Sequence, residues 1–341
     1  MVLSRRTTPT VAAVPQNGLD PQTIDSDAGI VSEATTLLEP EAAANGGSKY
    51  QHASQGKRLL SWAELPEWMK DNQYIFTGYR APANSFAKCF ASWFYLHNET
   101  GNIMTHLLGA LGFVILCFTV ASGLLLEFPT IDWNDITTMY IFLLSAIGCM
   151  ATSAIYHTVT CHSHSVQRAY NRCDYVGIVF LIVGSCVPVF CYMFYCHPRL
   201  KMFYLGLIFS LGLLTTYMVV APKFGTPAYR PLRAATFVAL GVSGVVPGVH
   251  SWWLFGWEYT RNAVQVPYML VMGLMYIVGA TLYGARFPER WWPGRFDYLL
   301  HSHQIFHVFV VIAAAVHFVG VCGALRWTHA VGISMCDTSL Q

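Results

Sequence analysis

Two histidines near the carboxyl end of the chain stand four residues apart, in the stretch HSHQIFHVFV that covers residues 301–310. On a helix, residues at this spacing lie on one face, with Cβ atoms about 6 Å apart. His303 and His307 could therefore bind one metal ion. Three histidines with an open fourth position is the arrangement of catalytic zinc sites, so the pair calls for a third ligand.

His157 can supply the third nitrogen and leave a tetrahedral position for water. Ser153 lies one helical turn before His157 and could hold that water. Asp174 could be the general base, or a partner that orients an imidazole. The sequence thus predicts Zn2+ bound by His157, His303 and His307, with Asp174 and Ser153 in catalytic roles.

Other readings of these residues stay open. A membrane histidine more often has a packing role, and an H-x-x-x-H pair alone is frequent by chance. Cys161 and Cys173 are less favoured as a fourth ligand, because the helix is expected to end before Cys161. His106 is a weaker candidate for a supporting role. We expect five histidines to lie away from the site: His162 and His164 in a solvated loop, and His250, His301 and His317.

Composition indicates a membrane protein. The chain is 54% hydrophobic and 11% charged, whereas ordinary soluble domains are about 25% charged. Such a chain could not cover its outside with polar residues. The net charge of +2 comes with no basic cluster, so nucleic acid is not an expected partner.

Apolar runs define the fold class. A helix needs about 20 largely apolar residues to cross a bilayer, and it satisfies its own backbone there. We therefore expect an all-α bundle of seven transmembrane helices. The charge-free stretches that predict them are 100–126, 136–159, 175–198, 202–222, 234–257, 262–285 and 298–325.

The chain divides into four predicted regions. Residues 1–59 have no apolar periodicity and no signal-peptide core, so we expect a disordered cytosolic region. Residues 60–100 form a juxtamembrane segment, in which 85–102 reads as an amphipathic helix at the membrane surface. Residues 101–325 form the helical bundle, and 326–341 form a short extracytosolic tail.

Loop charges support a cytosolic N-terminus and an extracytosolic C-terminus. Four basic residues fall on the outer side: Arg199, Lys201, Arg261 and Arg326. Ten fall on the inner side: Arg80, Lys88, Arg168, Arg172, Lys223, Arg230, Arg233, Arg286, Arg290 and Arg295. This orientation places His157, Asp174, His303 and His307 in one layer at the cytosolic face.

Several stretches carry a resemblance to a known family. They are LPEWMKDNQYIFTGYR, LHNETGNIMTHLLG, SAIYHTVTCHS, CDYVGI, GVSGVVP and PERWWPGRFDYLLHSHQIFHV. In this order they resemble the progestin and adipoQ receptor family, also called haemolysin-III-related, and within it the adiponectin-receptor-like branch with its fungal members. The match runs from about Leu60 to Leu325.

The resemblance implies both a site and an activity. The family pattern of a serine, a histidine four residues on, an aspartate and a late H-x-x-x-H corresponds to Ser153, His157, Asp174, His303 and His307. It implies zinc held by the histidines and slow hydrolysis of ceramide-type amides. Alkaline ceramidases share the serine, aspartate and histidine pattern. Membrane lipids such as ceramide and fatty acids are then the expected partners.

Two functions remain after these arguments. The chain is either a membrane hydrolase of amide-linked lipids, or a receptor or membrane-homeostasis sensor with a structural zinc. A zinc transporter fits less well, because the polar residues at one face make no path across. The sequence leaves open an extracellular protein ligand, the choice between plasma membrane and endoplasmic reticulum, and a disulfide of Cys196 with Cys322 or Cys336.

Overall fold

The computed structural model describes residues 58–225 and 229–336. The predicted disordered region 1–59 lies outside this part except for its last two residues. Among the described residues, seven helical segments are long and apolar enough to cross a membrane. The predicted all-α, seven-helix class is therefore confirmed.

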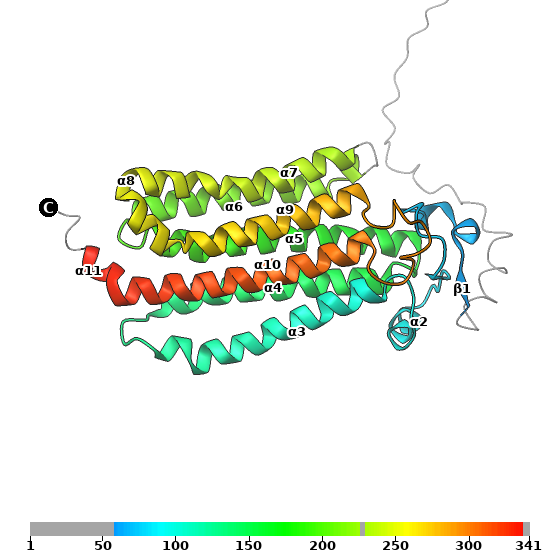
Figure 1. Ribbon diagram of the computed structural model, residues 1–341, viewed down its shortest axis with the longest axis horizontal. Helices are drawn as coiled ribbons and strands as arrows, with labels where there is room; N and C mark the ends of the chain where they lie inside the picture. Colours follow the sequence, from blue (N-terminus) through cyan, green and yellow to red (C-terminus); the bar gives the residue numbers. More distant parts are fainter. Residues whose placement is uncertain (1–57, 226–228, 337–341) are drawn as a thin grey trace, which may run out of the picture. The chain divides into compact units, whose positions relative to one another are not determined.

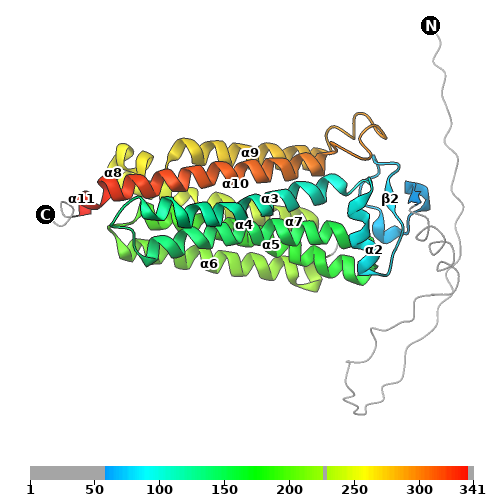
Figure 2. The same ribbon diagram turned by 90° about the horizontal axis from the view of Figure 1, so that it is seen from below.

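The long helices lie alongside one another (Figures 1 and 2). They are α3 Thr100–Ser122, α4 Trp133–Val159, α5 His164–Met193, α6 Pro198–Val220, α7 Arg230–Ser243, α8 Val245–Ala263, α9 Val266–Ala285 and α10 Ser302–Trp327. The fifth span consists of α7 and α8 together.

Short helical turns lie in the juxtamembrane segment and at the ends of the long helices. They are η1 Trp62–Glu64, η2 Glu67–Met69, η3 Ser92–Phe94, η4 Leu124–Leu126, η5 Pro222–Gly225, the π-helical turn η7 Thr328–Gly332 and α11 Ile333–Cys336. The predicted tail 326–341 is thus helical as far as Cys336. Its last five residues lie outside the described part.

Two helix boundaries differ from the predicted ones. The third span begins at His164 rather than 175. Charges at Arg168 and Arg172 interrupt a charge-free run, yet arginine is a good helix former, so α5 continues past the apolar layer. The stretch 234–257 is not one helix, because α7 ends at Ser243 and α8 begins at Val245. Within α8, Gly256 adopts φ +82°, a conformation that glycine reaches without a steric penalty.

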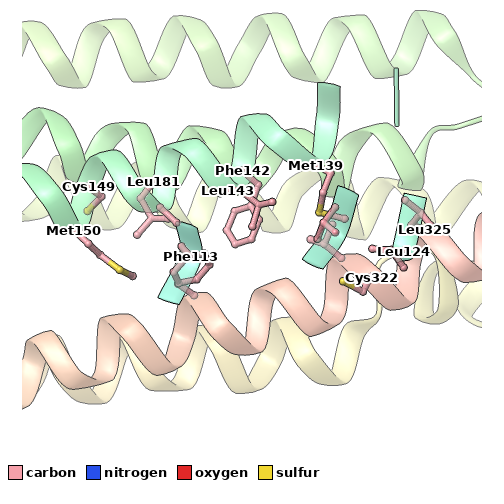
Figure 3. Packing of buried hydrophobic residues seen from close by; sticks show 14 of the residues in the cluster. Phe113, Leu124, Met139, Phe142, Leu143, Cys149, Met150, Leu181, Cys322 and Leu325 are labelled. Carbon is pink, nitrogen blue, oxygen red and sulfur yellow. The ribbon is translucent and has the colours of Figure 1, made fainter. Parts of the chain in front are cut away.

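The largest buried cluster lies mainly between α3, α4, α5 and α10. Figure 3 shows Phe113 from α3 beside Phe142 and Leu143 from α4, all buried. Within hydrocarbon, close packing rather than water exclusion drives helices together. At Gly177 of α5, an added Cβ would lie 2.5 Å from the Thr152 hydroxyl of α4, so this close approach requires glycine.

The juxtamembrane segment begins with a two-stranded ladder. Strand β1 Leu59–Leu60 pairs antiparallel with β2 Tyr79–Arg80. The predicted helix over 85–102 is wrong in length, because α2 covers only Phe86–Ala91 and α3 starts at Thr100. The Ser92 hydroxyl donates to the Cys89 carbonyl at 2.7 Å, and the chain is extended at Tyr95.

This segment is tied to the loop that precedes α10. Asp297 accepts hydrogen bonds from the Thr77 backbone N–H at 2.9 Å and from its hydroxyl at 2.7 Å. The buried Glu289 accepts from Asn72 Nδ2 at 3.0 Å and from the Ser302 backbone N–H at 2.8 Å. In Figure 1, β1 and α2 lie at the same end of the bundle as this orange loop. The juxtamembrane segment and the loop before α10, which are far apart in the sequence, thus together fix the start of α10.

Candidate metal centre

Three histidines lie together at the end of the bundle where α4 ends and α10 begins, which we call the cluster end. His157 is in the last turn of α4, and His303 and His307 are in the first two turns of α10. One ring nitrogen from each lies within 4.8 Å of the others. Nitrogens on one tetrahedral zinc are about 3.3 Å apart, given Zn–N bonds of about 2.0–2.1 Å. Small side-chain rotations would complete such a site.

The remaining nitrogens of two of these rings are held by α3. His157 Nδ1 lies 2.8 Å from Glu99 Oε2, and His307 Nδ1 lies 3.1 Å from the Asn102 carbonyl oxygen. Such partners fix the ring orientation of metal-binding histidines. His157 Nε2 is buried without a hydrogen-bond partner among the described residues. A metal ion would satisfy this nitrogen, so the buried cluster fits a metal.

Glu99 contacts the cluster and was not singled out by sequence reasoning. It precedes the first residue of α3, and Asn102 Nδ2 donates to its Oε2 at 2.6 Å. Burial opposes its charge, but the neighbouring His157 and the Asn102 amide outweigh burial and hold the pKa of the Glu99 carboxyl well below its usual range. An acidic residue directly before an apolar run was the available signal.

His106 supports the cluster from α3. Its ring stacks on His307 with 3.6 Å between centroids and 1° between planes. Both of its nitrogens are buried without hydrogen-bond partners in the described part of the chain. His106 is therefore placed to fix the plane of the His307 ring, and its supporting role stays a prediction.

Asp174 and Ser153 lie beside the histidines rather than among them. Ser153 is buried on α4, one turn before His157, and Asp174 is buried on α5. Ser153 and Asp174 come from adjacent helices, because α4 packs against α5. Asp174 does not belong to the group of mutually facing donors. The catalytic roles of Asp174 and Ser153 stay predictions.

Arg80 holds the end of α4 from the juxtamembrane segment. Its guanidinium donates to the His157 carbonyl at 2.6 Å and to the Thr158 carbonyl at 2.8 Å. Carbonyls in the last turn of a helix have no partner within it, and a cation is favourable there. Sequence reasoning counted Arg80 only as a loop charge, so its role in positioning His157 was missed.

The other histidines lie away from the cluster, as predicted. His301 Nε2 lies 3.0 Å from the Asn98 carbonyl oxygen, and His317 Nε2 lies 3.0 Å from that of Ser185. His250 pairs with the Tyr204 hydroxyl and His164 with Arg168. The expectation of a solvated His162 is wrong, because this ring is half-buried against Phe86, with 4.3 Å between centroids.

The cysteines also lie outside the cluster. Cys161 Sγ faces Cys89 Sγ at 3.6 Å, and Cys173 is exposed. Cys196 forms a disulfide with Cys336, whereas Cys322 is free. Of the two pairings that the sequence left open, the structure selects Cys336. This disulfide lies at the end of the bundle opposite the histidines, which we call the disulfide end.

The fold and the site together define a class: integral, multi-pass membrane proteins with seven helices and a buried histidine cluster at one end. Residues 94–318 match the family described as Haemolysin-III related. The chain belongs to this family, as the resemblance implied.

Named relatives indicate which branch of the family the chain resembles. The chain is 41% identical over 264 residues to the Adiponectin receptor protein of Drosophila melanogaster, covering 77% of this chain and 59% of that protein. It is 38% identical over 265 residues to Progestin and adipoQ receptor-like protein 1 of Caenorhabditis elegans, covering 77% and 60%. It is 37% identical over 273 residues to the ADIPOR-like receptor IZH2 of Saccharomyces cerevisiae, covering 80% and 86%. The match therefore spans about 60% of the length of the fly and nematode relatives.

Proposed function

We propose that this adiponectin-receptor-like protein is a zinc-dependent hydrolase of ceramide-type lipid amides, which releases a fatty acid and a sphingoid base. The observation that carries the proposal is the set of three facing imidazoles beside a buried carboxylate that is not one of them. An all-imidazole donor set with room for a further group suits zinc.

The chain's own residues account for the proton movements. Zinc held by the three histidines would polarise an amide carbonyl and make water acidic enough to act as a nucleophile near neutral pH. Asp174 accepts a proton from the attacking water while the Ser153 hydroxyl orients the carboxylate. The water oxygen bonds to the carbonyl carbon and the C–N bond breaks. Asp174 then returns its proton to the leaving amine.

The same proposal includes an orientation. The excess of basic loop residues on the side of the cluster end favours a cytosolic N-terminus. The Cys196–Cys336 disulfide lies at the other end, and disulfides persist mainly in oxidising compartments outside the cytosol. The C-terminus is then extracytosolic, where a protein ligand would act. An acyl chain would reach the cluster sideways from the bilayer of the plasma membrane or endoplasmic reticulum.

A receptor or sensor with a structural zinc is the second candidate. The bonds from His157 to Glu99 and from His307 to Asn102 connect α4 and α10 to α3, so a metal here would tie three helices together. The Drosophila and yeast relatives are also named as receptors. A structural site needs only its ligands, whereas hydrolysis also needs a proton acceptor. A substitution of Asp174 therefore distinguishes between the two proposed functions.

The test is the Asp174→Asn substitution in full-length protein, assayed for bound zinc and for fatty acid released from ceramide. We expect zinc to remain and hydrolysis to fall ~10²- to 10⁴-fold, because the proton acceptor is lost. Asp135→Asn is the matched control, since Asp135 is also buried but lies at the disulfide end. This control should keep both zinc and turnover.

Three outcomes would count against catalysis by Asp174. Unchanged hydrolysis in Asp174→Asn removes its role as proton acceptor. Loss of zinc makes it a ligand or an essential support of the ligands. A wild-type protein that holds zinc but releases no fatty acid from ceramide favours the structural-zinc receptor.

A further inference from the structure

Two cysteines far apart in the sequence meet at the cluster end. Cys89 belongs to α2, and Cys161 lies between α4 and α5. Their sulfur atoms are 3.6 Å apart, 72 residues separate them in sequence, and both are free. Both are almost fully buried. The pair lies outside the histidine cluster and has no part in the hydrolysis proposed above.

The backbone around the pair keeps the sulfurs together. The Ala83 N–H donates to the Cys161 carbonyl at 2.8 Å, and the Asn84 N–H donates to the His162 carbonyl at 3.0 Å. The Cys89 N–H donates to the Ser85 carbonyl at 3.1 Å. Backbone hydrogen bonds in both segments thus fix the positions from which the two side chains extend.

The two thiols are not equivalent. Either sulfur can donate in the hydrogen bond between them. When the Cys89 thiol donates, this bond and the nearby Arg80 guanidinium lower the pKa of Cys161 against the effect of burial. The same hydrogen bond and burial raise the pKa of Cys89. Thiolates are the reactive form of cysteine. A thiolate with a protonated thiol beside it is the arrangement of an attacking and a resolving cysteine.

We propose that Cys89 and Cys161 form a reversible disulfide site that is oxidised by hydroperoxides. The Cys161 thiolate attacks one peroxide oxygen, the O–O bond breaks, and the released hydroxide takes up a proton to become water. Cys161 is then a sulfenic acid. The Cys89 thiol attacks this sulfur, the S–S bond forms, and the hydroxyl leaves with the Cys89 proton as a second water. Two thiols are oxidised by two electrons, and one hydrogen peroxide is reduced to two waters.

Access to the buried pair comes from opening of α2. This helix has six residues, and helices so short are marginal on their own. Its Phe86 and Phe90 side chains are exposed, although the Phe86 ring contacts His162, so opening this short helix costs far less than global unfolding. Hydrogen peroxide is small enough to use a brief opening.

The cross-link would join the juxtamembrane segment covalently to the region that holds a metal ligand. Cys161 follows His157 by four residues, and Arg80 bonds both the His157 carbonyl and the Ser92 hydroxyl just beyond Cys89. Oxidation would therefore replace the hydrogen bond between the two sulfur atoms with a covalent bond just beyond the end of α4.

The test uses full-length protein reduced with dithiothreitol, freed of it, treated with hydrogen peroxide, alkylated and digested for mass spectrometry. We expect a Cys89–Cys161 linked peptide that is two hydrogens lighter than the separate peptides and is lost on renewed reduction. In Cys89→Ser, Cys161 should be trapped as a sulfenic acid that dimedone labels. In Cys161→Ser, Cys89 should stay unreacted.

Two other cysteines calibrate this experiment. Cys173 is exposed and free, so it reports that peroxide has reacted, and Cys149 is buried and free, so it reports nonspecific oxidation of the core. Oxidation at Cys173 while Cys89 and Cys161 are both recovered alkylated would overturn the proposal. Equal trapping of sulfenic acid at Cys89 and Cys161 in the two serine variants would overturn the assignment of roles.

Discussion

The cluster end and the disulfide end of the bundle both bury histidines, but they use them differently. At the disulfide end, His329 Nε2 lies 3.1 Å from Asp135 Oδ2, and His329 Nδ1 lies 2.8 Å from the Thr130 hydroxyl. Both of its nitrogens face protein groups. At the cluster end, His157 also has a carboxylate partner, Glu99, but its second nitrogen faces two other histidines.

The difference shows which observation indicates a metal. A buried histidine beside a carboxylate occurs at both ends, so this pairing alone does not indicate a metal site. The distinguishing feature is a second nitrogen directed at other metal-binding groups. Substitutions at matched positions of the two ends can break or sharpen this comparison.

The largest effect is expected from loss of a ligand. His307→Ala should lose bound zinc and hydrolysis, because two imidazoles remain of three. The matched control is His317→Ala on the same helix, where His317 bonds the Ser185 carbonyl. This control should lower the melting temperature while zinc stays bound. Metal analysis of both proteins checks the prediction, and zinc retained in both would refute the ligand assignment.

The next effect concerns the carboxylate that orients His157. Glu99→Gln should weaken zinc binding about 10- to 100-fold, the usual effect of removing a partner that orients a ligand. Glu127→Gln is the control at the disulfide end, because Glu127 pairs with Arg326. Competition against a chelator gives both affinities. Equal affinities in the two variants would mean that Glu99 does not act on the metal site.

A smaller effect is expected at the disulfide end. Cys196→Ser removes a cross-link between residues 140 positions apart. Helices that stay inserted restrict the unfolded chain already, so we expect the lower part of the usual range, about 1–2 kcal/mol. Thermal unfolding should show this loss with zinc content unchanged. Cys117→Ser, at a free cysteine, should show neither change, and zinc lost from Cys196→Ser would mean that the two ends are coupled.

The smallest effect is expected for Asp135→Asn. The amide keeps an acceptor for His329 but weakens the buried pair, so the free energy of unfolding should fall by about 1 kcal/mol. Zinc affinity should not change. A drop in zinc affinity comparable with that of Glu99→Gln would erase the distinction between the ends.

The sequence predicted the spans and the histidine cluster because both depend on local patterns. A run of apolar residues is visible without knowing its neighbours, and helical spacing alone put His303 and His307 on one face and His301 elsewhere. Loop charges then brought His157 to the same end. The start of α5 was misplaced because charged residues can continue a helix beyond the apolar layer.

The groups that orient the clustered histidines could not be predicted in this way. Arg80 acts on a carbonyl 77 residues away and Glu99 on a ring 58 residues away. Neither partner is apparent from spacing, because each contact depends on how the juxtamembrane segment and α3 pack against α4. The contact of Cys89 with Cys161 was missed for the same reason.

The ties between the juxtamembrane segment and the loop before α10 also set an order of events in biosynthesis. Thr77 cannot form its hydrogen bond until Asp297, which is 220 residues later in the chain, has been synthesised. At about 5–20 residues per second, the ribosome takes roughly 10–45 s to cover that distance. A nascent chain therefore has an incomplete cluster end until Asp297 has been synthesised. A truncated product that ends before Glu289 would lack the acceptors of both Asn72 and Thr77.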